Sequence, residues 1–127
     1  LELDVGVTRD GVVVVSHDPA LNPMITRRPD GTFLRERGPR IRDLSFADLQ
    51  RYDVGRLQPG TRYAATYPEQ TPVDGARIPA LAEVFALVKK AGNTTVRLSI
   101  ETKLNPLAPD DTPGPEDFAR RVIAAIR

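Results

Sequence analysis

The chain has 127 residues, enough for one domain, and its Val, Leu and Ile cluster in periodic runs, which excludes a disordered protein. Its 18 basic and 17 acidic residues give a net charge of +1, and no basic stripe of the kind that binds nucleic acid dominates the sequence. It has no Cys, which excludes disulfides and thiolate metal sites, and no apolar run reaches the roughly 18 residues of a membrane span.

Two strands joined by a tight turn are predicted at the start of the chain. Residues 1–8 alternate apolar and polar side chains, as expected for a strand that buries one face. Asp10-Gly11 is typical of a two-residue hairpin turn, and residues 12–15 form a β-branched second strand. Pro19 then ends the pattern, because its nitrogen cannot donate to a strand ladder.

Long loops and short elements are predicted for the remainder. In chain order these are a loop over 19–42, a short helix capped by Ser45, a loop over 55–79, a helix over 80–91, a strand over 95–101 and a final helix that opens at Glu116. Asp30-Gly31 indicates a small second hairpin in the first loop. The final helix is expected to pack through its apolar side, formed by Phe118, Val122, Ile123 and Ile126. This alternation predicts an α/β fold with βαβ units and a parallel sheet.

The pattern of strands and helices is cut at both ends of the chain. Leu1 falls inside a strand pattern, and no strand follows the final helix. We therefore expect further residues on both sides, so the lack of a visible signal peptide says little about location.

A pair of carboxylates on the first strand is the first candidate site. Glu2 and Asp4 are two residues apart and project from the same face. Like charges on a covered face repel and lose solvation, and a hard divalent cation with oxygen ligands would compensate. The alternative is an exposed edge strand with solvated carboxylates. If two residues make the turn, the register places His17, the only His, opposite Asp4, where it could transfer protons. The alternative for His17 is a structural role in the turn before Pro19.

The strand over 95–101 adds a third acid. Ser99, Glu101 and Lys103 share one of its faces, near the C-terminal end where α/β barrels keep their sites. Glu101 could complete the protein ligands of the cation. Lys103 could pair with Glu101 or hold an anionic oxygen, and the alternative is a salt bridge with no catalytic role.

Several short motifs, taken in order, resemble the glycerophosphodiester phosphodiesterase family. They are Glu2-Leu3-Asp4-Val5, Thr8-Arg9-Asp10-Gly11, Val14-Val15-Ser16-His17-Asp18, Ile78-Pro79-Ala80-Leu81 and Glu101-Thr102-Lys103. The resemblance implies a partial TIM (β/α)8 barrel of the phospholipase C-like phosphodiesterase type that covers only some of the strands. It also implies that residues 1–127 are a fragment of a single such domain. An insertion at about residues 20–75 is similar to the segment that these enzymes carry over the barrel mouth.

The resemblance further implies an activity and roles for the candidate residues. The activity is metal-dependent hydrolysis of glycerophosphodiesters to sn-glycerol 3-phosphate and an alcohol. Glu2, Asp4 and Glu101 would bind Ca²⁺ or Mg²⁺, and Lys103 would lie near the substrate phosphate. His17 would be one of two catalytic histidines, and we interpret it as the general acid to the leaving alcohol, with general base as the alternative.

One motif of the family is missing from these residues. The family's first strand ends in His-Arg-Gly, which supplies the second histidine and a phosphate-binding Arg, and the chain has no such motif. We therefore expect the 127-residue chain to be inactive if it is the whole molecule. Two other functions stay open: a phospholipase D acting on lysolipids or sphingolipids, and a non-catalytic module that binds a metal or a phosphodiester.

Partners and location follow from the same observations. The expected partner is a small-molecule glycerophosphodiester, with no nucleic acid and no stable membrane insertion. Open sheet edges would favour association, so a homo-oligomer is left open. The Pro-rich insertion resembles that of exported bacterial enzymes, which favours a periplasmic or secreted protein, with a cytoplasmic one as the alternative.

Overall fold

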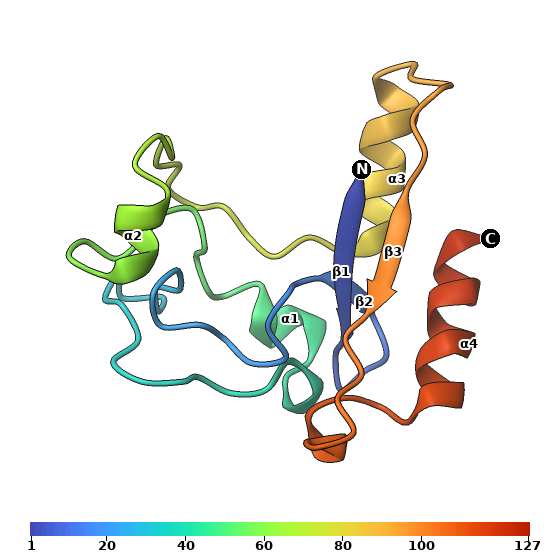
Figure 1. The fold of residues 1–127 in the computed structure, drawn as a ribbon, viewed down its shortest axis with the longest axis horizontal. Coiled ribbons are helices and arrows are strands. Elements are labelled where there is room, and N and C mark those ends of the chain that lie inside the picture. The colour runs from blue at the N-terminus through green and yellow to red at the C-terminus, as the bar shows by residue number, and fades with distance from the viewer.

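The computed structural model describes all of residues 1–127 and centres on a small mixed sheet (Figure 1). The sheet has the strand order β2-β1-β3, formed by β1 (Glu2–Val7), β2 (Val13–Val15) and β3 (Ser99–Thr102). β1 pairs with β2 antiparallel and with β3 parallel. The predicted strands are all present, but the third begins at Ser99 rather than near residue 95.

One face of the sheet packs against two helices. These are α3 (Leu81–Lys90) and α4 (Pro115–Ile126), and they bury a cluster that comprises Val5, Val7, Val13, Leu81, Phe118 and Val122. Strand alternation puts these valines on the face opposite the carboxylates, as the sequence predicts. The expectation that Ile123 and Ile126 are buried is wrong, because these side chains are 51% and 55% exposed. Of the predicted apolar side, only Phe118 and Val122 are buried against the sheet.

The opposite face meets a long segment, residues 20–75, with little regular structure (Figure 1). It contains η1 (Ile41–Asp43), α1 (Phe46–Leu49) and α2 (Arg62–Thr66). A second apolar cluster joins it to the sheet through Val14, Leu21, Leu34, Ile41, Leu49 and Ile78. The Ser45 cap of α1 is confirmed, since its hydroxyl accepts from the Asp48 N–H at 3.1 Å. α2 was not predicted, because it lies inside the expected loop over 55–79.

The hairpin between β1 and β2 has a three-residue turn, so the predicted two-residue turn is wrong. The Gly11 N–H donates to the Thr8 carbonyl at 3.0 Å, and the Thr8 N–H donates to the Val12 carbonyl at 3.0 Å. Gly11 takes a φ of +88°, the left-handed conformation that follows a type I turn in such loops. The Thr8 hydroxyl accepts from the Val12 N–H and donates to Asp10, which closes the longer turn.

The extra turn residue shifts the register of the hairpin by one position. Val5 lies opposite Val15, and the Ser16 N–H donates to the Asp4 carbonyl at 2.9 Å. Asp4 therefore faces Ser16, and the prediction that it faces His17 is wrong. His17 is the next residue along, so it leaves the strand beyond its last paired position.

The long segment is tied together by ion pairs. Arg27 contacts both Asp53 and Asp74, and Arg56 donates to Asp74 from Nη2 at 2.9 Å. Backbone bonds join Arg27 and Asp53 in both directions. The guanidinium groups of Arg56 and Arg27 hold the pKa of Asp74 far below its usual range. These contacts join parts of the segment that are far apart in the sequence.

The remaining predictions concern smaller elements. The hairpin predicted at Asp30-Gly31 is confirmed by a bridge between Arg27 and Phe33, with Gly31 at a φ of +84°. A short 3-10 turn, η2 (Pro109–Asp111), was not predicted. None of the helices combines the length and the apolar character that a membrane span requires.

Candidate functional site

Three carboxylates converge on the sheet face opposite α3 and α4. Asp4 of β1 pairs with Glu101 of β3 in the parallel register, and Glu2 lies two residues before Asp4 on the same face. One carboxylate oxygen from each residue lies within 4.8 Å of the others. The structure therefore brings together the three acids that the sequence predicts as metal ligands.

The innermost acid has an oxygen that lacks a hydrogen bond. The Asp4 side chain is 16% exposed, and its Oδ1 is buried without a hydrogen-bond partner. Lys103 Nζ lies 2.9 Å from Oδ1 as an ion pair, outside hydrogen-bonding geometry. The Lys103 ammonium offsets part of the carboxylate charge, and a hard cation with oxygen ligands suits the charge of the three carboxylates that remains. The donor set of three carboxylates thus fits Ca²⁺ or Mg²⁺.

Lys103 completes this cluster, as predicted. Its Nζ donates to Glu101 Oε1 at 3.0 Å, in addition to the ion pair with Asp4. The carboxylates of Asp4 and Glu101 raise the pKa of Lys103, so it stays charged. Three acids and one ammonium leave a net negative site, which attracts cations.

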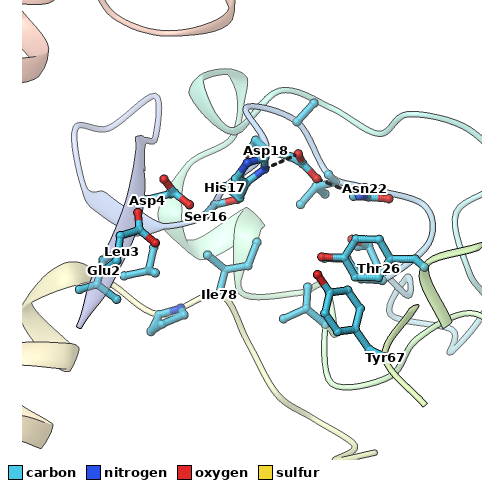
Figure 2. Close-up of a pocket in the computed structure, with 17 residues that line it drawn as sticks. Glu2, Leu3, Asp4, Ser16, His17, Asp18, Asn22, Thr26, Tyr67 and Ile78 are labelled. Atoms are coloured by element: carbon cyan, nitrogen blue, oxygen red, sulfur yellow. Dashed lines mark hydrogen bonds and ion pairs between the residues drawn. The ribbon is translucent and has the colours of Figure 1, made fainter. Parts of the chain in front are cut away.

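His17 stands beside this cluster on the segment that follows β2. Its side chain is 73% exposed, and Nδ1 lies 3.0 Å from Asp18 Oδ1. Asp18 in turn accepts from Asn22 Nδ2 at 2.8 Å. Because an ionised carboxylate only accepts, Nδ1 carries the proton in this contact and Nε2 is left for other chemistry. Figure 2 shows His17 between Asp4 and Asp18.

These side chains share a pocket of about 640 Å³ with residues of the long segment. Glu2 and Asp4 lie at one end, and Tyr67 of α2 lies at the other (Figure 2). Asp18 and the tyrosines Tyr63 and Tyr67 were not predicted as site residues. Asp18 follows His17 in one of the family-like motifs, but no role was predicted for it. The four-residue spacing of the two tyrosines could have indicated a short helix.

Comparison with known proteins decides the family. The model of the glycerophosphoryl diester phosphodiesterase family matches residues 1–122. The chain belongs to this family. The predicted resemblance is therefore confirmed, and it covers nearly the whole chain.

Individual relatives agree with the family match. The chain is 30% identical over 129 residues to a glycerophosphodiester phosphodiesterase of Bacillus subtilis (strain 168). A solved structure from Silicibacter pomeroyi DSS-3, provisionally named a glycerophosphoryl diester phosphodiesterase, is 31% identical with a TM-score of 0.90. A glycerophosphodiester phosphodiesterase structure from Agrobacterium tumefaciens str. C58 is 21% identical, with a TM-score of 0.54. The match covers 98% of this chain and 39% of the Agrobacterium chain, and at this identity it supports the fold alone.

The match covers all of this chain but only part of each relative. The chain spans 35% of the Bacillus subtilis protein and 43% of the Silicibacter pomeroyi chain. The match therefore shows the family of these 127 residues, but it does not show that they have the activity of a whole relative.

Proposed function

We propose that the protein hydrolyses glycerophosphodiesters to sn-glycerol 3-phosphate and an alcohol. The observation that carries this proposal is the convergence of Glu2, Asp4 and Glu101, because Glu2 and Asp4 line a pocket of about 640 Å³ together with His17. A pocket of this size accommodates a small phosphodiester. The family match supports the same reaction class.

The metal would be Ca²⁺ or Mg²⁺, held by Glu2, Asp4 and Glu101. When bound, the cation neutralises phosphate charge and activates the attacking oxygen. Lys103 lies beside the same carboxylates and supplies a positive charge to a non-bridging phosphate oxygen. These residues bind and orient the phosphate.

His17 serves as general acid in this proposal. Asp18 accepts from Nδ1–H and stabilises the imidazolium form, whose Nε2–H would pass its proton to the oxygen of the leaving alcohol as the phosphorus–oxygen bond breaks. The chain contains one His, so a second catalytic histidine is not among these 127 residues. We expect the 127-residue chain alone to bind the cation without turning over substrate.

The fold proposed for the active protein is a TIM (β/α)8 barrel. β1 and β3 are parallel neighbours, and α3 lies between them in the chain, which is the βαβ unit of such barrels. Both helices cover one sheet face and the carboxylates occupy the other, as in a barrel with outer helices and an inner site.

The test is an assay on the protein as its gene encodes it. Release of sn-glycerol 3-phosphate from a glycerophosphodiester is measured with Mg²⁺ or Ca²⁺, after chelation, and with His17→Ala. We expect release that depends on the cation and on His17. Failure to release glycerol phosphate, with intact binding of the cation, would favour the non-catalytic module. Faster hydrolysis of a lysolipid would favour the phospholipase D alternative.

A further inference from the structure

His17 has little packing to hold its ring in place. It lies two positions beyond Val15, the last paired residue of β2, and its side chain is 73% exposed. A side chain that its neighbours do not enclose samples several rotamers unless hydrogen bonds restrain it. The one hydrogen bond of the ring joins Nδ1 to Asp18 Oδ1 at 3.0 Å. The orientation of the ring therefore depends on what holds Asp18.

Asp18 is itself restrained from two sides. Ser16 Oγ donates to the Asp18 carbonyl at 2.9 Å, which restrains the backbone. Asn22 Nδ2 donates to Asp18 Oδ2 at 2.8 Å, while Oδ1 faces His17 (Figure 2). The two carboxylate oxygens thus have different partners. The carboxylate cannot rotate away from the imidazole without breaking the bond from Asn22.

The amide of Asn22 is oriented by the backbone. Asn22-Pro23-Met24-Ile25 is a tight turn, in which the Ile25 N–H donates to the Asn22 carbonyl at 3.2 Å. The Met24 N–H donates to Asn22 Oδ1 at 2.9 Å, the bond that Asn at the first position of a turn makes two residues on. Because a backbone N–H only donates, the amide oxygen faces Met24 and the NH2 group faces Asp18. A chain of three hydrogen bonds, the tether, thus runs from the turn to the imidazole.

A second turn in the chain shows that such a turn does not need a partner for the amide nitrogen. In Asn105-Pro106-Leu107-Ala108, the Leu107 N–H donates to Asn105 Oδ1 at 3.0 Å and the Ala108 N–H to the Asn105 carbonyl at 3.0 Å. The Asn105 side chain is exposed and makes only this turn bond. The oxygen of the amide therefore suffices to close an Asn-Pro turn. The nitrogen of Asn22 is left to bind Asp18.

We infer that Asn22 is a positioning residue, which acts through Asp18 to hold the imidazole of His17 in one orientation and one tautomer. This inference rests on the proposed function, because it assumes that His17 passes a proton to the leaving alcohol. The tethered Nδ1–H leaves Nε2 as the nitrogen for the substrate. Proton transfer needs a donor within hydrogen-bond reach of the reacting oxygen, so a ring that rotates freely spends less time in a productive geometry.

The first test observes the imidazole directly and needs no turnover. Nitrogen NMR of the protein as its gene encodes it reports which ring nitrogen of His17 carries the proton, and the His17→Ala protein assigns the signals. We expect a protonated Nδ1 in the neutral ring of the unaltered protein and a mixture of tautomers in Asn22→Ala. The same tautomer and the same line widths in both proteins would overturn the inference.

The second test compares rates of glycerophosphodiester hydrolysis. Asn22→Ala should lower kcat by about 3- to 30-fold and change KM by no more than about twofold, because the loss falls on proton transfer rather than on binding. Asn105→Ala is the matched control, since it loses the same turn bond. It should lower the midpoint of thermal unfolding by a similar amount and leave kcat within about twofold. Equal losses of kcat in the two variants, or a loss confined to KM, would overturn the inference.

A double variant separates positioning from a general effect of the turn. Because Asn22 acts through Asp18, Asn22→Ala should lower kcat by no more than about twofold in a protein that already carries Asp18→Ala. A further loss as large as that in the unaltered background would mean that Asn22 acts independently of Asp18, which contradicts the tether. Asn22→Ser keeps an oxygen for the turn bond but lacks the amide nitrogen, and it replaces Asn22→Ala if that variant does not fold.

These outcomes distinguish the inference from the proposed function. Hydrolysis that depends on His17 but not on Asn22 would leave the proposed function intact and overturn the tether. No hydrolysis by the unaltered protein would contradict the proposed function, and the tautomer of His17 in the Asn22→Ala protein would then decide the tether.

Discussion

The two faces of the sheet differ in how they are built and in what they contribute. On one face, α3 and α4 pack on valines through regular strand and helix periodicity. On the other, residues 20–75 are held by a separate apolar cluster and by the Arg27 ion pairs, with little regular structure. The first region fixes the carboxylates, whereas the second shapes the far end of the pocket. In our account, the chemical groups belong to the sheet, and the pocket wall that faces them belongs to the segment.

The largest effect is expected at the residue between the two regions. His17→Ala should lower glycerophosphodiester hydrolysis by about 10²- to 10⁴-fold, because the leaving alcohol loses its proton donor. Binding of the cation should be unchanged, since His17 is not a ligand in this account. Measured rates close to those of the unaltered protein would remove His17 from the catalytic machinery.

Core truncations on the two faces sharpen the comparison. Phe118→Ala should destabilise the fold by about 3–5 kcal/mol, and Leu49→Ala by about 2–5 kcal/mol, because both side chains are fully buried. Chemical denaturation monitored by circular dichroism gives these values. Ile123→Ala, on the exposed side of α4, is the control and should change stability by about 0.5 kcal/mol or less.

The same variants separate the functions of the regions. Leu49→Ala should loosen the segment, yet leave cation binding by the carboxylates in place. Loss of cation binding in the folded Leu49→Ala protein would show that the metal site depends on the segment as much as on the sheet.

The structure of the sheet region could be predicted from the sequence better than that of the segment 20–75. The alternation around Glu2 and Asp4 follows directly from the period of a strand, and a parallel neighbour brings Glu101 beside them. The register at His17 was missed because the Thr8 hydroxyl and Gly11 close a three-residue turn, which Asp10-Gly11 alone does not reveal.

The segment was harder to predict because its order comes from tertiary contacts. α2 has only five residues, too few for a reliable apolar period, and its neighbours Gly60 and Pro68 indicate a loop. The ion pairs of Arg27 join positions 26 and 47 residues away, and no local pattern marks them.

Acid should loosen the segment before the sheet region. Arg56 and Arg27 lower the pKa of Asp74. Burial alone would raise the pKa of Asp53. Hydrogen bonds from the N–H groups of Gly75 and Gly55 and from the Arg27 side chain outweigh burial, so the pKa of Asp53 is also lowered. Depressed carboxyl pKa values stabilise the fold above the unfolded value of about 3.9 and lose this effect as pH falls below it. NMR signals of the segment should change first below about pH 4, and simultaneous loss of both regions would contradict the comparison.

The smallest effect is expected in the turn that sets the register. Gly11→Ala should cost about 1 kcal/mol, because Gly11 holds a φ of +88° that alanine adopts with strain. Gly11→Asn is the matched control and should cost less, since asparagine tolerates this conformation. Thermal unfolding of both variants measures the difference, and equal midpoints would argue against the left-handed turn.

The most direct test of the account is titration of Mg²⁺ and Ca²⁺ into the protein by calorimetry. Asp4 is the least exposed of the three carboxylate residues, so Asp4→Asn should weaken binding of the cation by at least about tenfold. The control, Asp30→Asn, removes one exposed acid of the same type and should bind as the unaltered protein does. Binding that is absent in the unaltered protein, or equal in the Asp4→Asn and Asp30→Asn proteins, would contradict a metal site at Glu2, Asp4 and Glu101.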